Sequence, residues 1–144
     1  MDVSGEALKV ARRNAEDLSV KISFVCGDIL NTPFPGNPCY DIIVSNPPYV
    51  CASEAKDIEP RVLDYEPHTA LFVPDDNPLL FYKAISAYAR EALAPGGRLY
   101  FEINSRFPQE MRQLLQHDGF EDVDIRRDYL GAYRYAIAMQ PDNR

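Results

Sequence analysis

The sequence predicts an α/β protein built on a Rossmann-like, mostly parallel sheet. Amphipathic helical patterns alternate with short apolar runs that are rich in β-branched and aromatic residues. The last two runs, 123–127 and 133–139, are only a short loop apart, which predicts an antiparallel hairpin at one edge of the sheet. A chain of 144 residues without repeats or low-complexity linkers indicates a single domain over residues 1–144.

The first third of the chain predicts one helix and two strands. Ser4 is a suitable N-cap, and the run 22–26 predicts a buried strand that Gly27-Asp28 ends. After a proline-rich loop, the run 40–45 predicts a strand of the kind found inside parallel sheets. Apolar residues recur at helical spacing after Ser4, at Ala7, Leu8, Ala11, Ala15 and Leu18.

The remainder predicts a long loop, two helices and a central strand. Residues 50–76 show no clear period, and a loop of that length inside a domain is usually functional. Asn77-Pro78 predicts the N-cap and first residue of a helix that 95–97 (Pro-Gly-Gly) ends. A strand over 98–103 and a helix over 108–118 follow, and we expect helices on both faces of the sheet.

Composition excludes several classes of protein. The chain has 22 acidic and 15 basic side chains, so its net charge of −7 disfavours a protein that holds nucleic acid by neutralising phosphates. No apolar run approaches the roughly 18 residues of a membrane span, so we expect no membrane partner. The three cysteines form no C-x-x-C pair and have no histidine nearby, which predicts no metal site and favours the cytoplasm.

The strongest functional signal is the tetrad Asn46-Pro47-Pro48-Tyr49 directly after a predicted buried strand. Ligands of open α/β sheets bind outside the carboxyl ends of strands, where this tetrad lies. Two prolines stiffen the backbone and remove two N–H donors. The Asn46 oxygen and a proline carbonyl can then each accept one N–H of a planar NH2 group, while Tyr49 packs on its plane. We prefer this interpretation to a simple proline turn with Tyr49 in the core.

Three further residues fit a cofactor site. Asp2 would end a strand that precedes the first helix, where a carboxylate can accept both hydroxyls of a ribose. Asp28 ends the next strand, and Ile29 after it could cover an adenine ring. A strand-terminal aspartate is more often a cap or turn residue, so Asp2 is the stronger candidate of the two acids.

Other polar residues carry weaker signals. Glu66 lies in the long loop and could line the substrate entrance. His68 has no Ser, Cys or Asp partner at a recognisable spacing, so we do not expect a general base there. Arg127 and Arg134 flank the terminal hairpin, where we expect them to be solvated or ion-paired.

These motifs resemble the S-adenosylmethionine-dependent methyltransferases of Rossmann-like fold, and among them the N5-glutamine methyltransferases of peptide-chain release factors. The tetrad alone is shared with enzymes that methylate amino groups of DNA and RNA, whereas Glu66-Pro67 followed by Ala70-Leu71 narrows the resemblance to the glutamine group. The resemblance covers nearly the whole chain. It also rests on Asp2-Val3-Ser4 with Ala7-Leu8, Ala11 and Asn14, on Gly27-Asp28, on Ser45 to Val50, on Tyr65 before Glu66, and on Arg127-Asp128-Tyr129 with Arg134.

The resemblance implies a role for each matching residue. Asp2 would bind the ribose of S-adenosyl-L-methionine, Ile29 would lie beside its adenine, and Asn46 would touch both cofactor and substrate. The tetrad from Asn46 to Tyr49 would hold the glutamine of a Gly-Gly-Gln loop in the release factor. The amide nitrogen would attack the sulfonium methyl directly, without a separate catalytic base.

The sequence also departs from the family. It has no glycine-rich loop after a first strand, and Ile103-Asn104 stands where the family has a small residue or a His-Gly pair. The resemblance therefore implies a C-terminal part of such an enzyme, with the glycine loop and two strands missing. In the doubly wound order of the sheet, those strands would lie between the strand at Ile22 and the strand at Tyr40. We expect this chain alone to bind the cofactor weakly or not at all, and either to self-associate through the incomplete sheet or to let its first strand shift.

Two other functions remain open from the sequence. One is an amino-methyltransferase for adenine or guanine in nucleic acid, which the net charge disfavours. The other is a non-catalytic fragment that docks a peptide without turnover.

Overall fold

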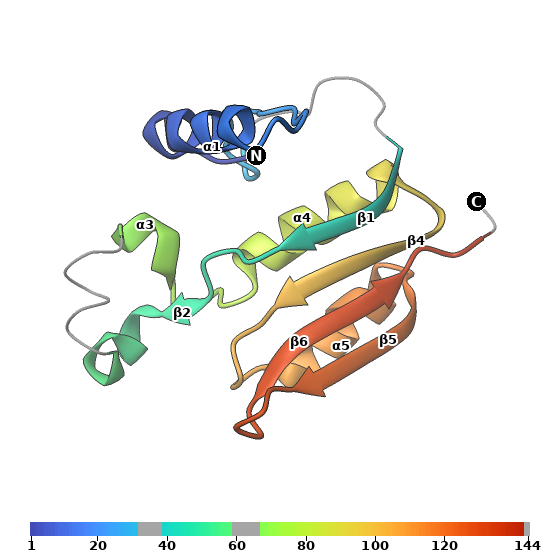
Figure 1. Cartoon of the computed structure of the whole chain (residues 1–144). Coiled ribbons are helices and arrows are strands. Elements are labelled where there is room, and N and C mark those ends of the chain that lie inside the picture. The colour runs from blue at the N-terminus through green and yellow to red at the C-terminus, as the bar shows by residue number, and fades with distance from the viewer. Residues whose placement is uncertain (32–38, 59–66, 143–144) are drawn as a thin grey trace. The chain divides into compact units, whose positions relative to one another are not determined.

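The computed structural model describes residues 1–31, 39–58 and 67–142. The chain divides into two compact units, Met1–Pro35 and Gly36–Arg144, which are treated separately below (Figure 1).

The first unit contains helix α1, Gly5–Asp17. The Ser4 hydroxyl accepts a hydrogen bond from the Ala7 N–H at 3.1 Å, which confirms the predicted N-cap. Leu8 and Ala15 are buried on one side of the helix, as the helical spacing predicts.

The predicted strand over 22–26 is wrong in extent. The described residues give it a single parallel bridge, between Asp2 and Cys26. The Asp2 N–H donates to the Val25 carbonyl at 3.1 Å, and the Gly27 N–H donates to the Asp2 carbonyl at 3.0 Å. A strand needs a continuous partner for its backbone groups, and here only one rung of a ladder is present.

The second unit holds a four-stranded sheet in the order β1-β4-β6-β5. Strand β1 is parallel to β4, whereas β6 is antiparallel to both β4 and β5. Three of the four strands therefore run in one direction, and the predicted hairpin lies at one edge (Figure 1). The strands are β1 Tyr40–Ser45, β4 Leu93–Glu102, β5 Glu121–Arg127 and β6 Tyr133–Met139.

Helices α4, Leu80–Ala92, and α5, Pro108–His117, both lie behind the sheet in Figure 1. In the described part of this unit, α4 and α5 therefore cover one face of the sheet, whereas the sequence predicts helices on both faces. The Tyr82 and Phe101 rings meet edge to face with centroids 5.2 Å apart. The core between these helices and the sheet includes Ile85, Ala89, Leu99, Ile103, Met111, Leu115 and Ala136.

Two predicted boundaries of α4 are wrong. Asn77 is not the N-cap; its carbonyl accepts from the Leu80 N–H at 3.2 Å in a turn that precedes the helix. The Pro-Gly-Gly run at 95–97 lies inside β4, because the Gly96 N–H donates to the Gln140 carbonyl at 3.0 Å. Pairing beyond the end of β6 thus extends the strand toward the helix.

The loop predicted over 50–76 contains short elements. Strand β2, Val50–Cys51, pairs in parallel with β3, Phe72–Val73. The 3-10 helix η1, Ala52–Asp57, and the single-turn helix α3, His68–Leu71, lie between them in sequence. Two-residue strands and helices of one or two turns are too short for a hydrophobic period to reveal. No helix in the described ranges is both long and apolar enough to cross a membrane.

Candidate functional site

The tetrad forms a corner where the main sheet passes into the small β2–β3 sheet. Strand β1 ends at Ser45, directly before the tetrad, and Asn46 is exposed while Pro47 is buried. The Tyr49 N–H donates to the Leu71 carbonyl at 3.2 Å, which fixes the exit of the corner beside β3. We call residues 46–49 the diproline corner. It lies at the carboxyl end of β1, as the sequence predicts.

The Tyr49 side chain is anchored by the neighbouring strand. Its hydroxyl donates to Glu102 Oε1 at 2.6 Å, and Glu102 is the last residue of β4. Burial, together with the hydrogen bond to this carboxylate, raises the pKa of Tyr49 to about 12. The phenol therefore stays protonated at neutral pH and cannot serve as a general base.

The corner's polar groups fall into two sets. The Tyr49 carbonyl accepts from the Asn104 amide at 2.9 Å and is therefore already occupied. Among the residues that the structure describes, none donates a side-chain hydrogen bond to the Asn46 side chain or to the carbonyls of Pro47 and Pro48. Three oxygen acceptors of the corner thus remain for a ligand with N–H groups.

A small hollow of about 210 Å³ adjoins the corner. Arg134 lines it, and its Nε donates to Asp128 Oδ2 at 3.1 Å, so this arginine is ion-paired as expected. The other lining residues are Tyr49, Val50, Glu54, Ile58, Asn104 and Ser105.

Of the four cofactor candidates, Asp2, Asp28 and Ile29 lie in the first unit, and Asn46 lies in the second. Asp2 is exposed, and its Oδ1 accepts from the Ser4 N–H at 2.7 Å. Asp28 uses both oxygens locally: Oδ1 accepts from the Leu30 N–H at 2.9 Å and Oδ2 from the Asn31 amide at 2.7 Å. These contacts are those of a turn residue, which favours Asp2 over Asp28 as a ribose ligand. Ile29, beside Asp28, is half-buried.

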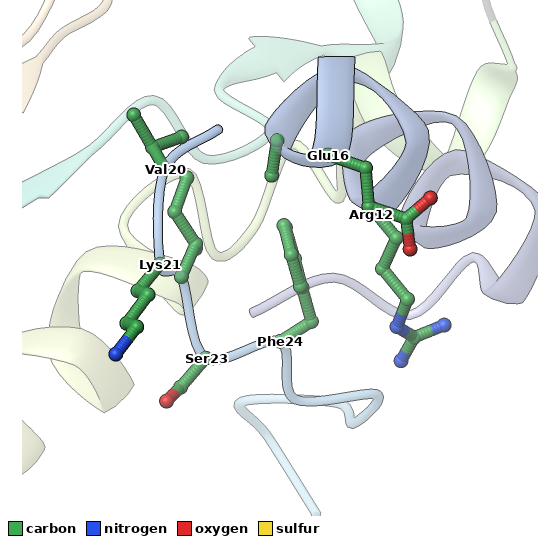
Figure 2. Close-up of a pocket in the computed structure, with 8 residues that line it drawn as sticks. Arg12, Glu16, Val20, Lys21, Ser23 and Phe24 are labelled. Atoms are coloured by element: carbon green, nitrogen blue, oxygen red, sulfur yellow. The ribbon is translucent and has the colours of Figure 1, made fainter. Parts of the chain in front are cut away.

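The first unit also has a larger hollow, of about 500 Å³. Figure 2 shows Phe24 and Arg12 beside one another in it, with the guanidinium carbon 5.7 Å from the centre of the ring. No predicted site residue lines this hollow. We therefore assign no function to it.

The two other polar residues considered in the sequence, Glu66 and His68, give no further support for a site. Glu66 lies outside the described residues. The His68 ring packs edge to face on Phe72 at 5.5 Å. Within the described ranges, no three His, Cys, Asp or Glu side chains gather as a metal site would require.

Sequence reasoning missed Glu54, Glu102 and Asn104 as neighbours of the corner. Glu102 and Asn104 stand at the end of β4, which is hydrogen-bonded to β1. Because the carboxyl ends of adjacent parallel strands meet at one edge of the sheet, the order of the strands could have pointed to both residues. Glu54 is brought in by η1, which the sequence does not predict.

Comparison with known proteins confirms the predicted resemblance. A family model described as "Methyltransferase small domain" matches residues 1–64. The release factor glutamine methyltransferase of Bacteroides thetaiotaomicron is 44% identical over 137 residues, covering 95% of this chain and 49% of that protein. The protein of the same name from Flavobacterium psychrophilum is 45% identical over 131 residues, covering 91% of this chain and 46% of its own length. The chain thus spans about half the length of these relatives.

Solved structures show the same fold. A methyltransferase from Pyrococcus furiosus has a TM-score of 0.65 at 19% identity, covering 96% of this chain and 60% of that one. An S-adenosylmethionine-dependent methyltransferase from Clostridium acetobutylicum has a TM-score of 0.57 at 14% identity, covering 96% of this chain and 73% of that one. At these identities the likeness establishes the α/β methyltransferase fold.

Proposed function

We propose that this chain carries the acceptor site of an S-adenosyl-L-methionine-dependent methyltransferase that methylates a glutamine side-chain amide in a peptide-chain release factor. The observation that carries the proposal is the diproline corner with Asn46 exposed at the end of β1. Two relatives, at 44% and 45% identity, are named release factor glutamine methyltransferases, which supports the choice of acceptor.

The corner's oxygens suit a carboxamide. Amide nitrogen is a poor nucleophile because its lone pair is delocalised into the carbonyl. Asn46 Oδ1 and a carbonyl of Pro47 or Pro48 would each accept one N–H, which orients the nitrogen and favours the positive charge that develops on it. Tyr49 would pack on the plane of the amide, since its protonated hydroxyl is held by Glu102. The nitrogen would take the methyl group, the sulfur would keep the electron pair of the broken C–S bond, and the surplus N–H proton would pass to solvent water.

The cofactor, when bound, supplies an activated methyl group on a sulfonium sulfur. The exposed carboxylate of Asp2 fits a ribose, because only one of its oxygens is used by Ser4. Ile29 would lie against the adenine, and Asp28 has the weaker claim because its turn occupies both oxygens. Asn46 would touch both cofactor and acceptor. We expect calorimetric titration of this chain alone with the cofactor to show no micromolar binding.

The remaining assignments belong to the same proposal. Glu66 would contact the acceptor protein near the Gly-Gly-Gln loop. Met1–Pro35 and Gly36–Arg144 would be parts of one catalytic domain. We also infer a cytoplasmic location, which suits three cysteines that are all free thiols.

The test is transfer of labelled methyl to a release factor. We would compare this chain with a chimera that joins the upstream half of the Bacteroides thetaiotaomicron relative to it. We expect the chimera to methylate the glutamine and Asn46→Ala to abolish transfer. Gln113→Ala, which removes an exposed amide side chain on α5, is the control and should leave transfer unchanged.

Two results would contradict the proposal. Full transfer by the Asn46→Ala chimera would remove the corner from the reaction. Binding of the release factor without any transfer by the chimera would support a docking function instead.

A further inference from the structure

The Asn104 side chain is a buried connector next to the diproline corner. It lies two residues beyond the end of β4 and is only 5% exposed. Its amide nitrogen donates to the Tyr49 carbonyl at 2.9 Å and to Glu54 Oε2 at 2.8 Å. Its oxygen accepts from the Arg106 N–H at 2.9 Å. Both amide hydrogens and the amide oxygen are therefore used, which fixes the orientation of the side chain.

Glu54 extends this connection to η1. Its Oε2 also accepts from the Cys51 N–H at 2.8 Å, and its Oε1 lies 3.5 Å from Arg106 Nη1. Burial alone would raise the pKa of Glu54, but the hydrogen bonds from Cys51 and Asn104 outweigh it and lower the pKa below its ordinary value. Asn104 thus meets a carboxylate that is itself fixed in place.

These contacts complete the support of the corner. The ring of each proline fixes φ, and Pro48 also restricts ψ of Pro47, but nothing in the rings fixes ψ of Pro48, so the downstream end of the diproline segment can still swing. At the upstream end, Ser45 is paired with Phe101 in the sheet. At the downstream end, the Tyr49 N–H is bonded to Leu71, and the Tyr49 carbonyl is bonded to Asn104. With both ends held, the carbonyls of Pro47 and Pro48 keep one direction.

We propose that Asn104 is a positioning residue for the acceptor: by holding the Tyr49 carbonyl and Glu54 it sets the direction of the acceptor oxygens in the diproline corner. This inference rests on the proposed function. Asn104 does not need to touch the acceptor, because its own polar atoms are occupied by the protein.

Asn104→Asp is the main test, because it keeps the shape of the side chain and the acceptor for the Arg106 N–H, removes both donors, and places a second carboxylate against Glu54. In the full 144-residue chain, we expect a changed ¹³C shift of the Tyr49 carbonyl and roughly tenfold faster exchange of the Tyr49 and Cys51 amide hydrogens. We also expect about tenfold weaker binding of an acetylated, amidated Gly-Gly-Gln peptide. Asn77→Asp is the matched control, since the Asn77 oxygen already accepts from Lys83 and a carboxylate keeps that contact.

A second variant separates positioning from general stability. In Asn104→Asp with Glu54→Gln, the new amide at 54 can donate to the new carboxylate at 104, but it gives up the bond that Glu54 Oε2 accepts from the Cys51 N–H, so the link between β4 and η1 returns in part. The Tyr49 carbonyl still lacks a donor. We therefore expect the free energy of unfolding to recover in part while the Tyr49 carbonyl shift and the peptide affinity stay altered.

The outcomes distinguish the two proposals. Peptide affinity that is unchanged in Asn104→Asp, or that recovers with stability in the double variant, would overturn the positioning role. If Asn104→Asp changes the Tyr49 carbonyl shift as expected but the unaltered chain has no affinity for the peptide, the proposed acceptor site itself would be overturned.

Discussion

At the scale of single residues, some polar groups hold the diproline corner in place, and others keep their hydrogen-bonding capacity for a ligand. Tyr49 and Asn104 both hold it, because their hydrogen bonds lead to protein atoms at the end of β4 and in η1. Asn46 is exposed and is the residue that we expect to meet the acceptor. The sequence predicts the corner because Asn-Pro-Pro-Tyr has local consequences for the backbone. It does not predict the supporting residues, because their contacts depend on segments about 50 positions away.

Tyr49→Phe tests the support from β4. The variant keeps the ring but removes the hydroxyl that donates to Glu102 at 2.6 Å. A hydrogen bond to a charged group contributes about 1.5–3 kcal/mol, so we expect denaturant unfolding to show a loss in that range. Tyr129→Phe is the control, because Tyr129 is 95% exposed and the change in the free energy of unfolding should be negligible. Equal stability of the two variants would contradict the anchoring of Tyr49.

The ionisation of Glu54 makes stability depend on pH. The pKa of Glu54 is lowered in the folded chain from an ordinary value of 4.5, so the folded chain binds fewer protons than the unfolded chain as the pH falls. The stabilisation is therefore present above pH 4.5 and is lost as pH falls through the lower folded pKa. We expect urea unfolding between pH 5 and pH 3 to show a smaller loss for Glu54→Gln than for the unaltered chain. Identical pH profiles would contradict the charged state assigned to this carboxylate.

At the scale of elements, prediction from sequence depends on length and on partners. The long periodic helices α1, α4 and α5 are predicted, and so are β1 and the β5–β6 hairpin. The strand over 22–26 is not confirmed, although its residues are suitable, because a strand forms only where another strand pairs with it. The sequence also places the start of β4 too late, at residue 98. Glycine is typical both of the end of a helix and of a close approach of two strands, so Gly96-Gly97 does not distinguish the two.

Gly97→Ala tests that close approach. A Cβ at position 97 would lie 2.9 Å from the Ala94 carbonyl oxygen and 3.1 Å from that of Tyr40, where β4 meets β1. Overpacking against backbone typically costs about 1–3 kcal/mol, and we expect that loss in thermal or denaturant unfolding. Gly5→Ala is the control, because nothing lies within 4 Å of its Cβ and helix α1 should gain slightly. A neutral Gly97→Ala would contradict the packing of β4 on β1.

At the scale of the whole molecule, the chain spans about half the length of the two relatives described above. In the described sheet, β1 is an edge strand, and Ile42 and Val44 on it are 58% and 75% exposed. Exposed apolar edge strands favour pairing with another chain.

We therefore expect this chain to self-associate through β1. Sedimentation should give a mass above the 16.3 kDa of one chain, and Val44→Lys should reduce it, since a charge on an edge strand opposes pairing. Lys83→Arg, on the exposed side of α4, is the control. A stable 16.3 kDa species for the unaltered chain would contradict the expectation.

The most direct measurement follows the glutamine carboxamide itself as it meets the corner. With a ¹⁵N-labelled side-chain amide in an acetylated, amidated Gly-Gly-Gln peptide, NMR reports both N–H protons separately. The account predicts that binding shifts both proton signals downfield, and that Asn46→Ala removes the shift of one of them. The central claim is that oxygens of the corner accept a hydrogen bond from each N–H of the glutamine amide. It would be contradicted by a bound peptide whose two amide protons resonate as they do in water. It would equally be contradicted by an Asn46→Ala chain that gives the same shifts as the unaltered one.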